Sequence, residues 1–532
     1  MNLIDDPWIP VRRRGGEQER LAPWQLTDGH EENPVVALDA PRPDFNGALL
    51  QFLIGLLQVA TPPAAVDDSD WEAWLEEPPN PDVLRQRFIP YAEAFQLDGE
   101  GPRFMQDLDA EAVIGQEPIK ALLIDAPGSQ TLKNNADHFI KRGGVEALCP
   151  ACAAMALFTL QTNAPSGGAG HRTSLRGGGP LTTLVVLDPV GDGLEETLWR
   201  NLWLNVLNKQ SYSLLTGNPA LEEKKDIFPW LAPTRISSKG GTDTYAEDVH
   251  PLQMYWAMPR RIRLDWESIA AGECDLCGES SEQLLKHYAT KNYGVNYNGS
   301  WEHPLSPHRI DKKSGELIPL HPQQGGFSYR HWLAWSNGND LVRAALVVRE
   351  FTNLSRRAEG SQLRMAAFGY DMDNMKARCW YESTVPLYTI DEAHREKFAH
   401  LVDALTKSAE EVAGFVRSCV KEAWFKRPGD AKGDTSFLND AFFNHTEGDF
   451  YAAVKALIDA IEAGEDGNDQ LLHWHGVLRS AAIELFDHWA AQESLEHANP
   501  RRIAAAHTKL IKLIHSKKIK NILLINNRER AA

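Results

Sequence analysis

Two pairs of cysteines in CxxC spacing are the residues of this chain best suited to chemistry. Cys149 and Cys152 form the first pair, and Cys274 and Cys277 form the second. A structural Zn²⁺ takes four soft ligands in a tetrahedron, and the short spacer lets both sulfurs of a pair bind the same ion. The sequence therefore predicts one structural zinc ion that is bound by all four cysteines.

A redox role for the first pair is the alternative interpretation. The segment Cys149-Pro-Ala-Cys152 has thioredoxin-type spacing and precedes a helix-favouring run at 151–160. A helix N-terminus lowers the pKa of a thiol, so a zinc-dependent or thiol–disulfide enzyme would use this pair. That interpretation leaves the second pair unexplained. Cys379 and Cys419 have no CxxC partner, and we expect both to be buried as small apolar side chains.

Three further segments carry residue types that suit contact with nucleic acid. The glycine-rich run 165–180 includes His171, Arg172 and Arg176. Its glycines would let the backbone approach a phosphate or a groove closely, although a plain connection between elements has the same composition. Segment 291–301 mixes one lysine with amides and aromatic rings, which suits base stacking or an ordinary hairpin. Segment 368–380 predicts a hairpin, which is either a surface feature or a wedge between base pairs.

Composition limits the functional classes. The chain has 532 residues, 43% of them hydrophobic, and a net charge of −18, which argues against a protein coated in nucleic acid but not against local contact. No apolar run approaches the ~18 residues of a membrane span. The opening residues hold Asp5 and Asp6 and lack an apolar signal segment, so we expect a cytoplasmic protein. The basic stretch after Arg501 is either a solvated helix face or a surface for phosphate or a partner.

The hydrophobic pattern changes character along the chain. Residues 1–381 alternate short strand-like runs with helices and Pro/Gly-rich connections, which indicates a large, irregular mixed α/β domain. Residues 382–532 have helical periodicity, as at Leu401 and Leu405 in the first helix and Leu472 and Leu478 in the third. We therefore predict an α+β chain in which an N-terminal domain with the zinc site precedes a C-terminal antiparallel four-helix bundle.

Taken together, these segments resemble the CasA family, the large subunit of the type I-E CRISPR Cascade surveillance complex. The resemblance extends through most of the chain. It is carried by Asn2-Leu-Ile-Asp-Asp-Pro-Trp-Ile-Pro-Val11, Glu146-Ala-Leu before Cys149, Arg176-Gly-Gly-Gly-Pro-Leu-Thr-Thr183, Asn298-Gly-Ser-Trp-Glu-His-Pro-Leu-Ser-Pro307 and Gly369-Tyr-Asp-Met-Asp-Asn374.

The resemblance implies a DNA-recognition subunit with no catalytic residue. Such a subunit reads the protospacer-adjacent motif of target double-stranded DNA, largely in the minor groove, while a guide RNA reads the target by base pairing. It helps to open the duplex for R-loop formation and recruits the helicase-nuclease of the antiviral defence. The implied partners are the crRNA 5′ handle and the backbone, 5′-handle-binding and small subunits of Cascade.

The resemblance also assigns roles to individual residues. The loop that contacts the crRNA 5′ handle and the backbone subunit falls on Phe139, Ile140 and Lys141. DNA contacts fall on the glycine loop (Gly167, Gly168, Ala169 and Gly170), on Lys291 as a lysine finger, and on Asp373 and Asn374 at the tip of a strand-separating wedge; the structural zinc ligands are Cys149, Cys152, Cys274 and Cys277.

Three positions depart from the pattern of the family. Ala169 stands where a glycine is expected, unless the loop is shifted and Gly168 or Gly170 takes that place. Asn374 replaces a glutamine and is shorter by one methylene. Lys291 aligns only with a one-residue shift, so Asn292 and Lys286 are alternative contacts.

Overall fold

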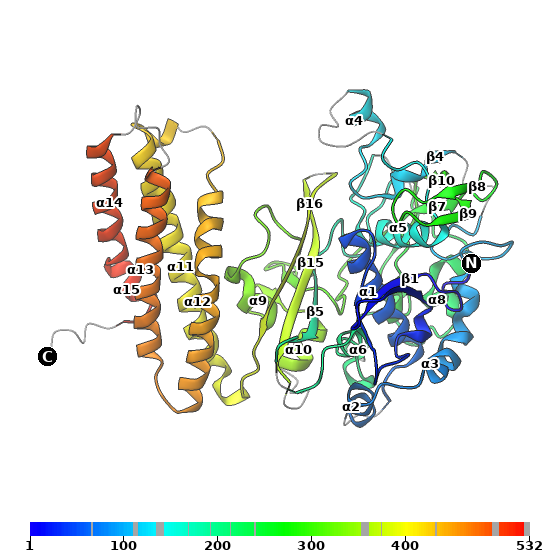
Figure 1. Cartoon of the computed structure of the whole chain (residues 1–532), viewed down its shortest axis with the longest axis horizontal. Helices are drawn as coiled ribbons and strands as arrows, with labels where there is room; N and C mark the ends of the chain where they lie inside the picture. The colour runs from blue at the N-terminus through cyan, green and yellow to red at the C-terminus, as the bar shows by residue number, and fades with distance from the viewer. Residues whose placement is uncertain are drawn as a thin grey trace. The chain divides into compact units, whose positions relative to one another are not determined.

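A computed structural model of the chain describes residues 1–64, 68–109, 115–134, 143–168, 170–191, 193–212, 214–238, 241–352, 361–373, 375–430, 433–491 and 499–525. The chain divides into two compact units. The first unit comprises residues 1–323 and 339–387, and the second comprises residues 324–338 and 388–532. The expected mixture of helices and sheets is confirmed, with the strands in the first unit and the long helices in the second (Figure 1).

The first unit is built from short elements joined by many irregular connections. Its helices are α1 (Pro43–Ala60), α2 (Ser69–Glu76), α3 (Pro81–Phe88), α4 (Ser129–Lys133), α5 (Pro150–Asn163), α6 (Leu198–Trp203), α7 (Lys209–Tyr212), α8 (Lys224–Ile227) and α10 (Leu346–Thr352). Its strands are β1 (Ile9–Arg13), β2 (Gln18–Leu21), β3 (Val35–Leu38), β4 (Glu117–Pro118), β5 (Thr182–Leu187), β6 (Asp243–Thr244), β7 (Arg261–Leu264), β8 (Ala270–Glu273), β9 (Ser280–Leu284), β10 (His287–Lys291), β11 (Asn296–Tyr297), β12 (His308–Ile310), β13 (Leu317–Pro319), β14 (Val342–Arg343), β15 (Leu363–Asp373) and β16 (Lys376–Leu387).

Two apolar helices, α1 and α5, occupy the core of the first unit. Both begin with a proline at the first helical position, and both are buried on nearly every side, as expected of helices that are apolar all round. Phe52 of α1 is fully buried. Its ring lies edge-on, with centroids 5.3–5.8 Å apart, to the rings of Trp8, Phe95, Phe104, Phe158 and Trp256. This aromatic cluster joins segments that are far apart in the sequence.

Small sheets make up much of the rest of the first unit, and all but the parallel pair of β6 and β11 are antiparallel within the described residues. The longest strands, β15 and β16, pair from Leu363 with Leu387 to Asp373 with Lys376, and β5 pairs with the other edge of β15. Strand β10 pairs with β7 in a register that places Lys291 opposite Arg261. Strands β8 and β9 form a separate hairpin. These are the elements that position the predicted site residues.

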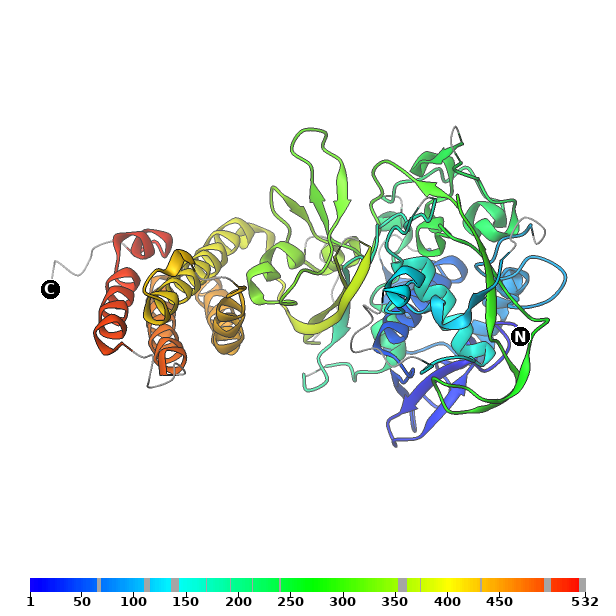
Figure 2. The ribbon, with the colours of Figure 1, turned by 90° about the horizontal axis from the view of Figure 1, so that it is seen from above.

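The second unit consists mainly of helices. They are α9 (Trp332–Ser336), α11 (Arg395–Trp424), α12 (Phe437–Glu462), α13 (Asn468–Ala491), α14 (Pro500–Ile514) and α15 (Lys517–Ile522). Helices α11 to α14 lie side by side, as both views show (Figures 1 and 2). Leu401 and Leu405 of α11 are buried as the periodicity predicts, whereas Leu472 of α13 is 46% exposed because Leu471 and Trp474 face the neighbouring helices instead. The Trp474 indole donates to the carbonyl of Leu405 at 3.1 Å.

The segment 324–338 inserts aromatic side chains among the long helices. Tyr329 stacks on Phe450 of α12 with centroids 4.2 Å apart, and its hydroxyl lies 2.8 Å from that of Thr446. This segment interrupts the first unit in sequence but packs in the second. Within the described residues, no helix combines the length and the apolar character that crossing a membrane requires.

The aromatic cluster makes a stability prediction. Replacing Phe52 by alanine removes a fully buried ring, so we expect the free energy of unfolding of the first unit to fall by about 3–5 kcal/mol. Val190→Ala is the matched control, because Val190 is 92% exposed and its loss should change stability by less than about 0.5 kcal/mol. Urea denaturation followed by tryptophan fluorescence measures both, and equal effects would contradict the assignment of Phe52 to the core.

Candidate zinc centre and nucleic-acid interface

Both cysteine pairs converge on one point of the first unit. The sulfurs of Cys149, Cys152, Cys274 and Cys277 all lie within 4.8 Å of one another, and those of Cys149 and Cys277 are 3.8 Å apart. A tetrahedral zinc ion with Zn–S bonds of about 2.3 Å separates its sulfurs by about 3.8 Å. The donor set and its spacing therefore fit a four-coordinate metal ion such as Zn²⁺. This convergence also gives the second pair a role, which the redox interpretation of the first pair does not.

The first knuckle is the N-terminus of α5. Cys149 is the N-cap residue, Pro150 takes the first helical position, and the backbone N–H of Cys152 points to the Cys149 sulfur at 3.5 Å. A thiolate at this position accepts a hydrogen bond and lies at the positive end of the helix dipole. The helix that buries its apolar length in the core thus also presents the two sulfurs.

The second knuckle is the turn between β8 and β9. The backbone N–H of Gly278 donates to the carbonyl of Cys274 at 2.9 Å, and Gly278 has φ of +75°. A left-handed conformation at this point favours glycine over any residue with a Cβ. The N–H of Cys274 donates to the carbonyl of Glu279 at 2.9 Å, which closes the turn.

Backbone and side-chain hydrogen bonds hold the two knuckles together. Leu148 and Leu285 exchange N–H to carbonyl bonds of 2.9 and 2.8 Å. The Asp275 carboxylate, inside the second knuckle, accepts from the backbone N–H groups of Glu146 and Ala147 at 2.7 and 2.8 Å. The segment that precedes the first knuckle is therefore fixed by the second.

Electrostatics favour a cation among the four sulfurs. Hydrogen bonds from Cys149 and then Cys152 lower the pKa of Cys274, whereas the hydrogen bond to Cys149 raises the pKa of Cys152. The pKa values diverge because thiolates so close together repel one another, and one thiolate is stabilised by the S–H groups of its neighbours. A Zn²⁺ ion removes this repulsion and allows all four sulfurs to ionise.

The two remaining cysteines differ in their burial. Cys419 is buried in α11 as expected, but Cys379 is exposed, so its predicted burial is wrong. Cys379 lies in β16, which is the edge strand of its sheet, and its side chain falls on the solvent face.

The glycine loop and the segment after Lys291 are in direct contact. The carbonyl of Gly170 accepts from the N–H of Tyr293 at 2.7 Å. Gly170 has φ of +82°, and a Cβ there would lie 2.8 Å from the Tyr293 ring and 2.9 Å from its backbone nitrogen. Gly168 also has positive φ, but a Cβ on it would meet nothing within 4 Å. Only glycine allows the close approach of Gly170 to this neighbour.

The arginines around the glycine loop hold it in place. The Arg260 guanidinium donates to the carbonyls of Pro165 and Arg172 at 2.5 and 2.7 Å and lies 3.0 Å from Nδ1 of His171. Burial lowers the pKa of Arg260 to about 10, which still leaves it charged at neutral pH. Arg172 bonds to the side chain and the carbonyl of Ser237. These interactions occupy side chains that a phosphate-binding loop would present to its ligand.

Arg176 has a similar internal role. It is only 4% exposed and donates to Thr182 and Ser306 at 3.1 Å and to Gln51. Its burial excludes it from contact with a phosphate backbone. In the sequence, the arginines of the glycine-rich run suggested contact with phosphate. In the structure, Arg172 and Arg176 bond to other parts of the protein and hold the loop in place, rather than forming a surface for a ligand.

Lys291 and the β15–β16 hairpin are the other predicted contacts that the structure describes. Lys291 ends β10 with an exposed side chain, and its ammonium makes no ion pair with any residue in the described ranges. Asp373 ends β15, with its carboxylate 3.9 Å from Arg378, while Asp371 receives two bonds of 2.7 and 2.9 Å from the same guanidinium. Met375, which follows the tip, is 56% exposed.

The glycine-rich run contacts the hairpin as well as the Lys291 segment. A Cβ on Gly179 would lie 2.7 Å from Tyr370 of β15, and Gly179 has φ of +63°. The run therefore contacts the segment after Lys291 at Gly170 and the β15–β16 hairpin at Gly179. Phe139, Ile140, Lys141, Ala169 and Asn374 lie outside the described residues.

Helix α5 and strands β9 and β10 join the zinc knuckles to the glycine loop and Lys291. Helix α5 follows its N-cap Cys149 and runs from Pro150 to Asn163, just before the glycine loop, and its 14 residues span about 21 Å. Strands β9 and β10 follow Cys277 and end at Lys291. Gln161 of α5 bonds to the backbone of Arg260, next to β7, at 2.9 Å in each direction. The first knuckle thus lies at the start of α5, and the second lies before β9, which leads into the strand that ends at Lys291.

Several residues of this region escaped the sequence analysis. Tyr293, Asp275 and Met375 lie within segments that the sequence motifs singled out, whereas Arg260 lies outside all of them. The hydrogen-bond partners of Tyr293, Asp275 and Arg260 are distant in the chain. The only local signal is chemical type, such as an apolar Met375 in a polar hairpin tip. The basic C-terminal stretch is also partly internal, since Arg502 donates to the carbonyls of Ala423 and Trp424 at the end of α11.

A known protein family matches most of this sequence. A sequence model of the CRISPR-associated protein Cse1 family matches residues 2–485. The chain belongs to the Cse1 (CasA) family. The resemblance predicted from the sequence motifs is therefore confirmed.

Solved structures of Cse1 proteins share the fold. CasA (Cse1) of Thermus thermophilus is 20% identical, with a TM-score of 0.66 and 96% of this chain and 99% of that chain covered. Cse1 of Thermobifida fusca is 17% identical, with a TM-score of 0.69 and 98% of each chain covered. A chain of a CRISPR RNA-guided surveillance complex is 16% identical, with a TM-score of 0.63 and coverages of 97% and 99%. At identities of 16–20%, these matches show that this chain shares the fold of Cse1 proteins.

Metal content tests the zinc centre. We expect about one zinc ion per purified chain, and Cys274→Ser should lower that content towards zero because an incomplete thiolate set binds Zn²⁺ far more weakly. Cys379→Ser should keep the metal, since Cys379 is exposed and outside the cluster. Elemental analysis by mass spectrometry measures both. A wild-type chain without zinc, or a Cys274→Ser variant that keeps it, would contradict the assignment.

The packing of Gly170 makes a second prediction. Gly170→Ala should lower the free energy of unfolding by about 1–3 kcal/mol, because the added Cβ meets backbone and the conformation is left-handed. Gly168→Ala carries only the conformational cost, about 1 kcal/mol, and is the matched control. Urea titrations compare the two variants, and an equal loss would show that the approach to Tyr293 is not tight.

Proposed function

We propose that this Cse1 chain is a non-catalytic DNA-recognition subunit of a crRNA-guided antiviral complex. It would read the protospacer-adjacent motif in double-stranded DNA and help to open the duplex for R-loop formation. The observation that carries this proposal is the contact of the glycine-rich run with both Tyr293, beside Lys291, and Tyr370 of the β15–β16 hairpin. Membership of the Cse1 family and the likeness to a chain of a surveillance complex support it.

The glycine loop and Lys291 would hold the motif. A loop without bulky side chains at Gly167, Gly168 and Gly170 lets backbone amides enter the narrow minor groove, where A·T and G·C pairs differ mainly by one amino group. The exposed ammonium of Lys291 would contact a base edge or phosphate beside that loop. Minor-groove contacts of this kind distinguish DNA sequences only weakly, so the subunit would bind several related motifs.

The β15–β16 hairpin would separate the first base pairs. Asp373 and Asn374 form its proposed tip, and the exposed Met375 adds an apolar surface that can replace lost stacking. The ion pair between Arg378 and Asp371 braces the base of the tip. Unstacking costs a few kcal/mol per step, which contacts around the tip and the growing heteroduplex must offset.

Other parts of the chain would serve assembly. The zinc ion would be structural, and Phe139, Ile140 and Lys141 would contact the crRNA 5′ handle and the backbone subunit. Helices α11 to α14 would form an antiparallel four-helix bundle, in a C-terminal domain from residue 382, that docks small subunits. A change in the position of the whole subunit would then recruit the helicase-nuclease, in the cytoplasm.

Binding of target duplex to the guide-loaded complex tests these roles. The double variant Lys291→Ala, Asn374→Ala should weaken duplex binding on the order of tenfold or more, because a charged contact and the wedge amide are lost. The slope of log K against log salt should fall by about 1 in magnitude if Lys291 contacts a phosphate. Assembly with crRNA and the other subunits should be unchanged.

A matched control removes a lysine of the same unit that is already neutralised. Lys225 is paired with Glu223 at 2.7 Å, so Lys225→Ala should leave duplex binding within about twofold of wild type. If the Lys291→Ala, Asn374→Ala variant assembles normally and binds the duplex as tightly as wild type, the proposed contacts of Lys291 and Asn374 with DNA are wrong.

A further inference from the structure

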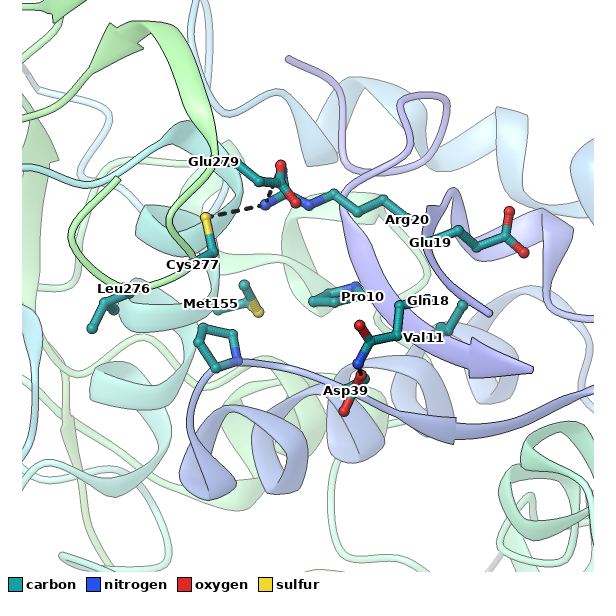
Figure 3. A pocket seen from close by; sticks show the side chains of 11 residues that line it. Pro10, Val11, Gln18, Glu19, Arg20, Asp39, Met155, Leu276, Cys277 and Glu279 are labelled. Atoms are coloured by element: carbon teal, nitrogen blue, oxygen red, sulfur yellow. Dashed lines mark hydrogen bonds and ion pairs between the residues drawn. The ribbon is translucent and has the colours of Figure 1, made fainter. Parts of the chain in front are cut away.

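One of the four metal-binding sulfurs faces an open cavity. Cys149, Cys152 and Cys274 are at most 3% exposed, whereas Cys277 is only partly buried. A cavity of about 310 Å³ lies against Cys277 and is also lined by Arg20, Glu279, Met155 and residues of β1 and β2 (Figure 3). Water, protons and small chelators therefore reach the metal centre most directly at Cys277.

Arg20 covers this sulfur from a different part of the chain. It projects from β2, and its Nη2 lies 3.3 Å from the Cys277 sulfur and 2.8 Å from Oε2 of Glu279 (Figure 3). Its side chain is 23% exposed, and its Nε is buried without a hydrogen-bond partner in the described part of the chain. A guanidinium stays charged at physiological pH, so a cation lies against this sulfur.

The charge of a four-cysteine zinc centre explains why a guanidinium would lie there. Four thiolates and one Zn²⁺ sum to a net charge of −2, and this excess is partly exposed at Cys277. An N–H···S bond from a cation stabilises the metal-bound thiolate. Partners of this kind around the ligands of metals commonly change affinity by about 10–100-fold.

We propose that Arg20 is a positioning residue of the zinc centre, which holds Cys277 as a metal-bound thiolate and slows loss of the ion through the open cavity. Glu279 keeps the guanidinium over the sulfur by accepting from the same Nη2 atom. The contact also ties β2 to the β8–β9 turn across 257 residues of sequence. Neither residue binds the metal itself.

Transfer of zinc to a coloured chelator tests this role in the full-length chain. With 4-(2-pyridylazo)resorcinol in excess, Arg20→Gln should release zinc about tenfold faster than wild type. Arg20→Lys keeps the charge but loses the planar fork, so its rate should fall between the two. Arg14→Gln is the matched control, because Arg14 pairs with Glu195 at the surface and should leave the rate unchanged.

Two further readouts separate this role from a general loss of structure. Iodoacetamide labelling, followed by mass spectrometry, should rise several-fold at Cys277 in Arg20→Gln, while Cys149 keeps its protection and the exposed Cys379 serves as reference. In the Co²⁺-loaded chain, loss of the N–H···S bond should shift the sulfur-to-metal charge-transfer band to longer wavelength.

The result that overturns the proposal is defined by the same measurements. Unchanged zinc release and unchanged Cys277 labelling in a folded Arg20→Gln variant would show that the contact does not act on the metal centre. Equal labelling of all four cysteines, with a lower thermal midpoint, would assign Arg20 a purely structural role. A wild-type chain that binds no zinc would also overturn it.

Discussion

Four cysteine sulfurs that must share one point in space are the constraint on which the region around the glycine loop and Lys291 depends. Two thiolates at the separation of the Cys149 and Cys277 sulfurs repel one another unless a cation lies between them. A metal ion bound by all four sulfurs would hold the N-terminus of α5 next to the turn before β9. The glycine loop follows the far end of α5, and Lys291 ends β10, which follows β9 in the sequence. The hydrogen bond from Tyr293 to Gly170 closes the frame at that end.

The arginines around the glycine loop and the hairpin bond to other parts of the protein and hold these segments in place. Arg176 is buried, and Arg260 half-buried, among carbonyl, hydroxyl and amide oxygens, and Arg378 is bound to Asp371. Lys291 is exposed at the end of its strand, beside a loop of small residues. In the proposed function, a duplex would meet the exposed ammonium of Lys291 and the backbone of the glycine loop. A net charge of −18 fits such local contact better than binding over a broad basic face.

Residue types and their spacing predict the residues of the site better than they predict the contacts around those residues. The CxxC pairs carry their geometry in their spacing, so their convergence could be expected, and local motifs identified the family. The burial of Arg176 and the exposure of Cys379 could not be expected, because each depends on a sheet or core partner far away in sequence. The same holds for Arg20 and Cys277, which are 257 residues apart. Helical periodicity placed Leu401 and Leu405 correctly but misplaced Leu472, where the adjacent Leu471 takes the buried position.

Strand opening by a guide-loaded complex, assembled with and without this chain, tests the central claim most directly. The substrate is a library of target duplexes in which the bases flanking the target are randomised, and reactivity of unpaired thymines reports the opened strand. The account predicts that opening requires this chain and depends on the identity of the flanking bases. Opening that is equally efficient without the chain, or indifferent to the flanking bases in its presence, would contradict it.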